Sequence, residues 1–146
     1  MRFIAGTYTK MGGEGVVLCE EKNGKLIRIA AYDAAHDPTY VIPSMDGKGF
    51  VSVGKENGNG YVQRFSLAGD AISAMERAYI GRSGCCHLAF SKEGDALFTA
   101  NYASGSLSVL PVKNGVIQDA VQIIDHVPLS GGQAHAHFVG LDPKDE

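Results

Sequence analysis

The sequence repeats itself every 45 to 47 residues, and this spacing limits the folds open to the chain more than any other feature. Gly15, Gly60 and Gly105 lie 45 residues apart, and each opens a run that alternates between polar and apolar residues or stays apolar. A second set of similar segments recurs every 47 residues, at 3–6, 50–53 and 97–100. Because independent landmarks share nearly one period, the repeat reflects the architecture of the fold.

A period of about 45–50 residues, made of short strands and glycine-rich turns, is typical of β-propeller blades with four strands each. Helical repeats of this length would need apolar residues at 3.6-residue spacing, and the sequence shows almost none. The stretch from Ala71 to Ile80 is the best helical candidate, but we interpret it as an outer strand. The sequence therefore predicts an all-β fold, a β-propeller fragment of roughly three four-stranded blades.

The repeat also divides the chain into units. Residues 1–35 are expected to supply the last three strands of one blade, 36–83 and 84–130 two complete blades, and 131–146 the start of the next. Propellers close with about 4–8 blades, so this chain holds too few for a ring. We expect a truncated or partial version of a longer propeller, or a protomer whose open blade edges are covered by self-association.

Composition excludes several function classes. The chain has 13 basic and 16 acidic side chains, and 45% of its residues are hydrophobic, as in a folded domain rather than a basic nucleic-acid binder. Its apolar runs are too short to span a membrane, and no signal-peptide pattern opens the chain. Three cysteines without CxxC spacing favour free thiols and a cytoplasmic location.

The strongest chemical motif is Gln133-Ala134-His135-Ala136-His137. Histidines two residues apart point to the same side of a strand, and the repeat places His137 at the entrance to an innermost strand, beside the central channel. One imidazole could act as a general base that the other orients, or the pair could bind substrate or a metal. Two polar side chains that only hydrogen-bond the backbone at a strand end remain the structural alternative.

A second candidate is the stretch from Ala100 to Ser106, which carries Asn101, Tyr102 and two hydroxyl groups. Such groups suit a sugar-like ligand, although turn chemistry explains them about as well. Arg82 and Lys55 are loop cations that could bind a phosphate, although we favour solvated surface charge for each.

The pair Cys86-His87 would fit a thiol nucleophile beside a base. Adjacent strand residues face opposite sides, however, and cysteine is often simply buried, so we favour a structural role for this pair.

The order of these motifs resembles the lactonase family of seven-bladed propellers, which includes bacterial 6-phosphogluconolactonase and fungal carboxy-muconate cyclase. The resemblance rests on Gly6-Thr7-Tyr8-Thr9, on 81–88, on Asn101-Tyr102 with Gly105-Ser106, and on the histidine motif. It covers the whole chain but only the amino-terminal part of the family ring. Family members usually have Arg-Gln, a short spacer and Pro before the first histidine, whereas Gly132-Gln133-Ala134 stand here.

The resemblance implies hydrolysis of a phosphorylated sugar lactone, 6-phosphogluconolactone of the pentose phosphate pathway, without a metal or organic cofactor. It gives the catalytic role to His135 and His137, with Gln133, Asn101 and Tyr102 as substrate-binding neighbours. A neutral histidine would deprotonate the attacking water, and amide or phenol donors would stabilise the oxyanion. A muconate-type lactonizing enzyme, a non-catalytic binding propeller and an inactive remnant remain alternatives.

Overall fold

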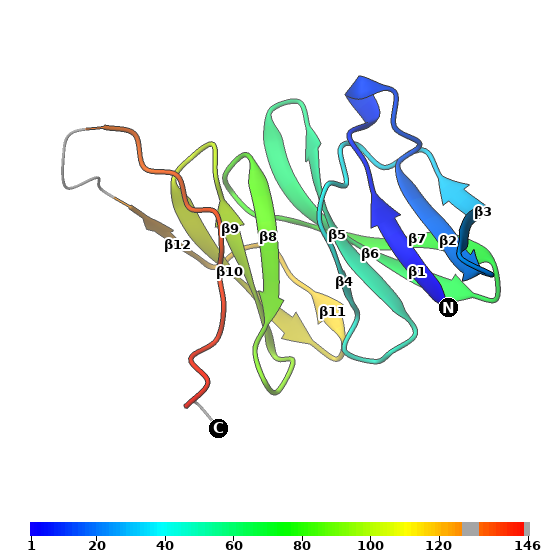
Figure 1. Ribbon diagram of the computed structural model, residues 1–146. Coiled ribbons are helices and arrows are strands. Elements are labelled where there is room, and N and C mark those ends of the chain that lie inside the picture. Colours follow the sequence, from blue (N-terminus) through cyan, green and yellow to red (C-terminus); the bar gives the residue numbers. More distant parts are fainter. Residues whose placement is uncertain (127–131, 145–146) are drawn as a thin grey trace.

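The computed structural model describes residues 1–126 and 132–144. In this part the chain forms three antiparallel sheets, one after another along the sequence (Figure 1). The first sheet contains β1 (Arg2–Gly6), β2 (Val16–Lys22) and β3 (Lys25–Tyr32), with a short 3-10 helix, η1 (Thr9–Met11), after β1. The second contains β4 (Val41–Pro43), β5 (Gly49–Glu56), β6 (Asn59–Ala68) and β7 (Ala71–Tyr79).

The third sheet contains β8 (Cys85–Phe90), β9 (Ala96–Asn101), β10 (Ser106–Lys113), β11 (Val116–Ile117) and β12 (Gln122–Asp125). Both β11 and β12 pair with β10, at different parts of that strand. The predicted all-β class is confirmed, and Ala71–Tyr79 is a strand as expected. No helix among the described residues is long and apolar enough to cross a membrane.

Asn-Gly pairs make three of the tight turns between neighbouring strands. Both residues of each pair have positive φ, and the pairs are Asn23-Gly24, Asn57-Gly58 and Asn114-Gly115. A two-residue loop with positive φ at both positions matches the right-handed twist of the strands that it joins, and Asn and Gly tolerate that backbone conformation best. The local sequence therefore fixes the register of these hairpins.

The apolar core lies in two layers between the sheets. Successive side chains of a strand point to opposite faces, so Phe50 packs toward the first sheet while Val51 packs toward the third. In the layer toward the first sheet, the Phe50 and Phe65 rings stack at 4.9 Å. Because both faces of β5 are covered, five consecutive residues of this strand are buried, 50–54. Burial of this kind is the main driving force that holds the sheets side by side.

The glycines of the 45-residue repeat share one structural cause. A side chain at Gly15 would clash with the Tyr32 carbonyl, one at Gly60 with the Arg82 carbonyl, and one at Gly105 with the Ala134 carbonyl. Each glycine thus lies against backbone at the end of the outermost strand of its own sheet or beyond it. Only a residue without a Cβ leaves room for that chain to pass.

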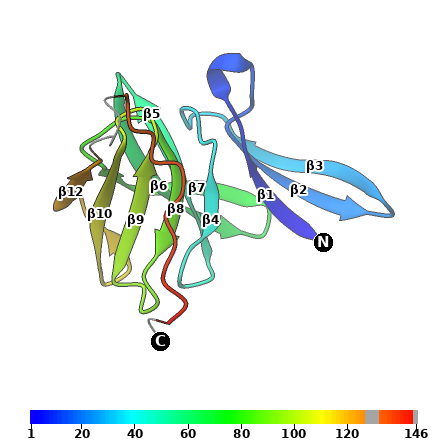
Figure 2. The same ribbon diagram turned by 60° about the vertical axis from the view of Figure 1, so that its left-hand side comes forward.

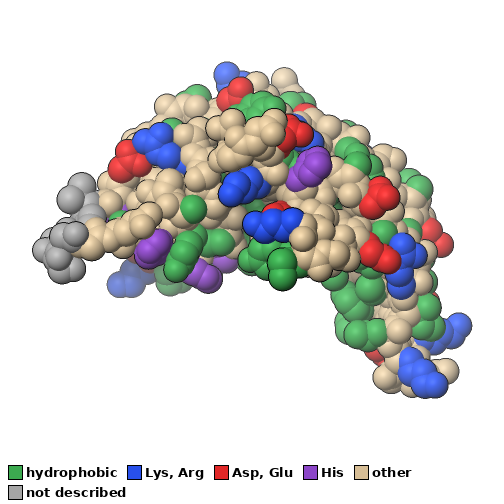
Figure 3. Space-filling view, turned by 90° about the horizontal axis from the view of Figure 1, so that it is seen from above, with side chains coloured by type: hydrophobic (Ala, Val, Ile, Leu, Met, Phe, Trp, Pro, Cys, Tyr) green, Lys and Arg blue, Asp and Glu red, His purple; other side chains and the backbone are tan. Residues whose placement is uncertain are grey.

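Seen from above, the molecule is an arc with one concave side (Figure 3). The segment 132–144 runs beside β8 in both ribbon views (Figures 1 and 2). We expected His135 and His137 at the entrance to a strand, but the structure assigns no strand to 132–144. A strand needs a neighbour with which to exchange backbone hydrogen bonds, and no strand in the described part of the chain pairs with this segment.

Candidate functional site

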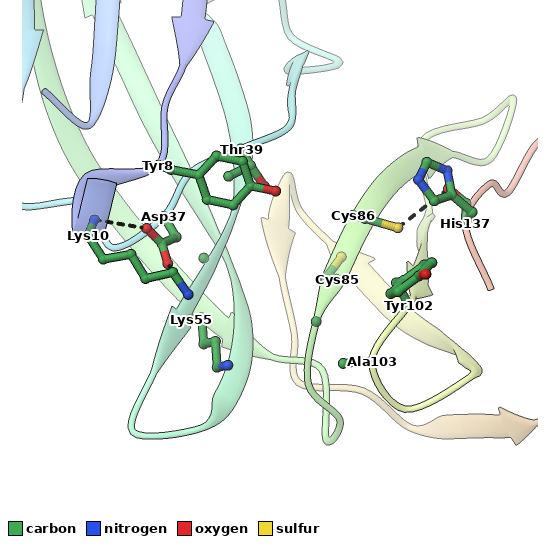
Figure 4. Close-up of a pocket in the computed structure, with 12 residues that line it drawn as sticks. Tyr8, Lys10, Asp37, Thr39, Lys55, Cys85, Cys86, Tyr102, Ala103 and His137 are labelled. Atoms are coloured by element: carbon green, nitrogen blue, oxygen red, sulfur yellow. Dashed lines mark hydrogen bonds and ion pairs between the residues drawn. The ribbon is translucent and has the colours of Figure 1, made fainter. Parts of the chain in front are cut away.

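A cleft of about 340 Å³ opens where the three sheets meet. Figure 4 shows two walls that face each other across it. Side chains from the first two sheets and their connections form one wall, and β8, the β9–β10 turn and segment 132–144 form the other. The lining residues with ionisable or hydrogen-bonding side chains are Tyr8, Lys10, Asp37, Thr39, Lys55, Cys85, Cys86, Tyr102 and His137.

The wall from the first two sheets carries two cations, Lys10 and Lys55. Lys10 follows β1 in η1, and its ammonium lies 3.6 Å from the Asp37 carboxylate. Among the described residues, no carboxylate lies within 4.0 Å of the Lys55 ammonium. The charge of Lys10 is therefore partly compensated by Asp37, and the charge of Lys55 remains available to an anionic ligand.

Asp37 holds this wall together. Its φ is +49°, in the left-handed region that an aspartate tolerates better than most residues. The Thr9 hydroxyl donates to the Asp37 carboxylate at 3.2 Å and accepts from the Asp37 backbone N–H at 3.0 Å. The Lys10 backbone N–H donates to the same carboxylate at 3.2 Å. These bonds fix η1 against the chain that leads into β4, and so position Lys10.

The opposite wall brings the predicted histidines to Tyr102. The His135 ring stacks on Tyr102 at 4.3 Å, and its Nδ1 lies 3.0 Å from the Tyr102 carbonyl oxygen. His137 meets the same phenol ring edge-on at 5.7 Å. His137 lines the cleft and is exposed, as a group that reacts with a ligand has to be. Tyr102, which is 44% exposed, also lines the cleft.

Gln133 and Gly105 support this arrangement through contacts between the histidine segment and the β9–β10 turn. The Gln133 amide donates to the Ala103 carbonyl at 3.2 Å, so it fastens the segment to the β9–β10 turn. Ala134 lies against Gly105, at the close approach described above. Gln133 does not line the cleft, and its contacts are those of a support for the histidine motif.

The two neighbouring cysteines are poor nucleophiles. Burial raises the pKa of the Cys85 thiol to about 12, and burial also raises the pKa of Cys86. A thiol attacks as its thiolate, so both changes reduce reactivity at neutral pH. The Cys86 thiol instead points at the His137 carbonyl oxygen, at 3.4 Å. None of the three cysteines, all in described parts of the chain, forms a disulfide.

Besides Gln133, two further residues expected to bind substrate do not line the cleft. Asn101 is fully buried, and its side chain bonds Thr99, Ser106 and Ser108. The Arg82 guanidinium pairs with the Asp125 carboxylate at 2.7 Å, which raises the pKa of Arg82 and lowers that of Asp125. In this structure Asn101 stabilises the third sheet, and Arg82 ties the end of β12 to the loop before β8.

Sequence reasoning missed Lys10 and Asp37, and for Lys55 it favoured solvated surface charge over a phosphate contact. Asp37 lies in the loop between β3 and β4, whose backbone conformation the sequence does not reveal. Lys10 directly follows the Thr7-Tyr8-Thr9 motif, so its neighbourhood was the available signal. Among the described residues, no group of three or more His, Cys, Asp or Glu side chains is placed to hold a metal ion.

Comparison with known proteins places this site in context. Residues 2–146 match the family described as "Lactonase, 7-bladed beta-propeller". The chain is 28% identical to a 6-phosphogluconolactonase of Bacillus subtilis, over 95% of its own length and 42% of that protein. The chain thus spans about two-fifths of the curated relative that it matches.

Solved structures agree on the fold. A crystal structure of a protein described as a putative 6-phosphogluconolactonase from Bacteroides uniformis superposes with a TM-score of 0.75 at 21% identity, covering 85% of this chain and 37% of that one. The periplasmic gluconolactonase of Pseudomonas aeruginosa gives a TM-score of 0.76 at 22% identity, covering 84% and 38%. At this identity the likeness establishes the shared architecture of three consecutive sheets.

Proposed function

Because the chain belongs to the family of seven-bladed β-propeller lactonases, we propose that its cleft binds a phosphorylated sugar lactone and takes part in hydrolysis of the ring ester. The observation that carries the proposal is one cleft with His137 on one wall and the cations Lys10 and Lys55 on the other. An imidazole provides a base near neutral pH, and an ammonium provides a partner for a phosphate.

The residues divide the reaction between the two walls. His137 accepts a proton from the water that attacks the lactone carbonyl, which makes this water a stronger nucleophile. The Tyr102 hydroxyl, from a residue on the same wall, stabilises the oxyanion that forms on the carbonyl. The ring ester C–O bond then breaks, and the leaving oxygen takes up the proton from His137. The product is an open-chain sugar acid.

His135 has a supporting part in this mechanism. Its stacking on Tyr102 and its bond to the Tyr102 carbonyl fix the phenol ring against which His137 also packs. Preorganised groups of this kind lower the barrier because they need no rearrangement during the reaction.

Lys10 and Lys55 bind the phosphate at the far end of the substrate. Their wall faces His137 across a space of about 340 Å³, within the range of small-molecule sites. Two lysines attract a dianion as point charges and leave the sugar free to align with the histidine wall.

The experiment is lactone hydrolysis followed by pH-stat, with glucono-1,5-lactone and its 6-phosphate as substrates, each corrected for the rate in buffer. We expect Lys55→Gln to raise KM for the phosphorylated lactone by about tenfold, the loss of one charge-assisted contact, and to leave the neutral lactone unaffected. Lys113→Gln, at an exposed lysine at the end of β10, is the control for a change in net charge.

Wild-type protein that hydrolyses both lactones no faster than buffer would contradict the proposal. Turnover of a muconate lactone in place of either sugar lactone would favour the lactonizing alternative. An equal change in KM for both substrates in Lys55→Gln would remove the phosphate role of this wall.

A further inference from the structure

Two side chains of β8 hold the backbone of the histidine motif, where strand pairing is absent. The Cys86 thiol donates to the His137 carbonyl at 3.4 Å. Two residues further along, the Val139 backbone N–H donates to Nδ1 of His87 at 3.5 Å. The segment follows β8 in both ribbon views (Figures 1 and 2), which agrees with these contacts. The position of His137 in the cleft therefore depends on what β8 presents to 137–139.

The hydrogen bond from Val139 determines the form of the His87 ring. A nitrogen that accepts a hydrogen bond carries no proton, so Nδ1 is unprotonated and the neutral ring holds its proton on Nε2. Nε2 lies 2.8 Å from the Tyr40 hydroxyl and donates to it. The ring is also packed between two aromatic side chains, Tyr40 at 4.5 Å and Phe138 at 4.3 Å between centroids. Each ring nitrogen of neutral His87 thus has a partner of the right kind.

A second proton on this ring would break the arrangement. Protonated His87 carries N–H groups at both nitrogens, so Nδ1–H would point at the Val139 N–H and could no longer accept from it. Burial and then the charge of His137 lower the pKa of His87, and together they outweigh the backbone contact with Val139, which raises it. The ionisable groups that face the ring are Tyr40 from the connection into β4 and His137 from segment 132–144.

We propose that His87 is a positioning residue: its neutral ring fastens 137–139 to β8 and so holds His137 at the cleft, and protonation of the ring releases this stretch. The consequence for activity rests on the proposed function, whereas the contact itself does not. His87 does not line the cleft, so it acts through the placement of His137.

The test is NMR on the ¹⁵N-labelled protein, with wild type compared with His87→Asn and His87→Leu. Asn places a carbonyl oxygen near the position of Nδ1 and does not titrate, while Leu offers no acceptor. In wild type we expect the Nε2–H tautomer of His87, and a shift of the Val139 amide signal as the ring titrates on the acid side of an ordinary histidine. In His87→Asn this acid-side shift disappears and the amide stays protected from exchange. In His87→Leu the Val139 amide exchanges about fivefold faster or more at every pH, the loss of one hydrogen bond.

The Nδ1–H tautomer in wild-type His87, or a Val139 amide that behaves alike in all three proteins, would overturn the proposal. The His87→Asn variant is the decisive comparison: the same acid-side shift in that variant would assign the effect to another group near the segment. In hydrolysis assays we expect His87→Leu to lower kcat with little change in KM, and His87→Asn to restore kcat. Absence of hydrolysis in wild type would contradict the proposed function alone, and the NMR comparison would still decide the role of His87.

Discussion

The sharpest test of the fold concerns Asn101, the buried amide of the third sheet. Its Nδ2 donates to Ser108 Oγ at 2.8 Å and to Ser106 Oγ at 3.2 Å, and its Oδ1 accepts from the Thr99 hydroxyl at 2.9 Å. Ser108 in turn donates to the Ile80 carbonyl of the chain that leaves β7, at 2.8 Å. The network therefore joins the third sheet to the second.

Replacement of Asn101 by Ala removes three hydrogen bonds with unequal consequences. Ser108 keeps the Ile80 carbonyl and Ser106 keeps Ser104, so each of these two losses costs about 1 kcal/mol. The Thr99 hydroxyl, which is fully buried, loses its acceptor and adds about 1–3 kcal/mol. We expect the free energy of unfolding to fall by about 3–5 kcal/mol, which lowers the urea midpoint by about 1 M or more.

Equilibrium unfolding in urea, followed by circular dichroism, measures this change, and Asn59→Ala, at an exposed asparagine of β6, is the matched control. Thr99→Val completes the cycle: in the Asn101→Ala background it removes the orphaned hydroxyl, so it should cost less there than in wild type. The reasoning would be refuted if Asn101→Ala lowered the free energy of unfolding by less than about 1 kcal/mol. It would also be refuted if Thr99→Val lowered that free energy equally in wild type and in the Asn101→Ala background.

Three further results are expected. Gly105 has φ +62° and lies against the Ala134 backbone, so Gly105→Ala should displace the histidine segment and shift the NMR signals of His135 and His137. Gly24→Ala is the control: Gly24 also has positive φ but faces open space, so these signals should stay in place. Unchanged signals in Gly105→Ala would contradict the close approach. Because burial raises the pKa of Cys85 to about 12, this thiol should react with iodoacetamide at pH 8 at least about tenfold more slowly in folded than in unfolded protein. Mass spectrometry of peptides measures both rates, and equal rates would be incompatible with the burial of Cys85. On the third sheet and the segment beside it, the apolar side chains of Val121, Ile124 and Phe138 are 71%, 45% and 70% exposed. We therefore expect self-association, with a mass by light scattering that rises above 15.4 kDa with protein concentration. A mass that stays constant would argue against self-association.

The fold could be predicted from the sequence because the sequence signals for it are local. Paired Asn-Gly turns, alternating apolar strands and a glycine every 45 residues each act within one sheet, and their period reveals how many sheets follow. The cause of that glycine spacing was not visible, since the clash at Gly60 is with Arg82, which only the folded chain brings close.

The site was predicted less completely, because its parts come together over long separations. His137 and Tyr102 were found from a motif, and the structure brings both to one cleft. Asn101 looks like a ligand-binding amide in a turn, yet its partners on β9 and β10 take up its hydrogen bonds inside the sheet. Arg82 looks like an available cation until Asp125, 43 residues later, is placed beside it.

The central claim is that His137 acts as the base in a lactone-hydrolysing cleft, and the most direct test is the turnover of 6-phosphogluconolactone by wild type and by His137→Ala. We expect wild type to exceed the buffer rate and His137→Ala to lose about 10²-fold or more in kcat, the usual contribution of a general base, while unfolding in urea stays nearly unchanged at this exposed position. Equal kcat in the two proteins, or a wild-type rate no higher than that of buffer, would contradict the account.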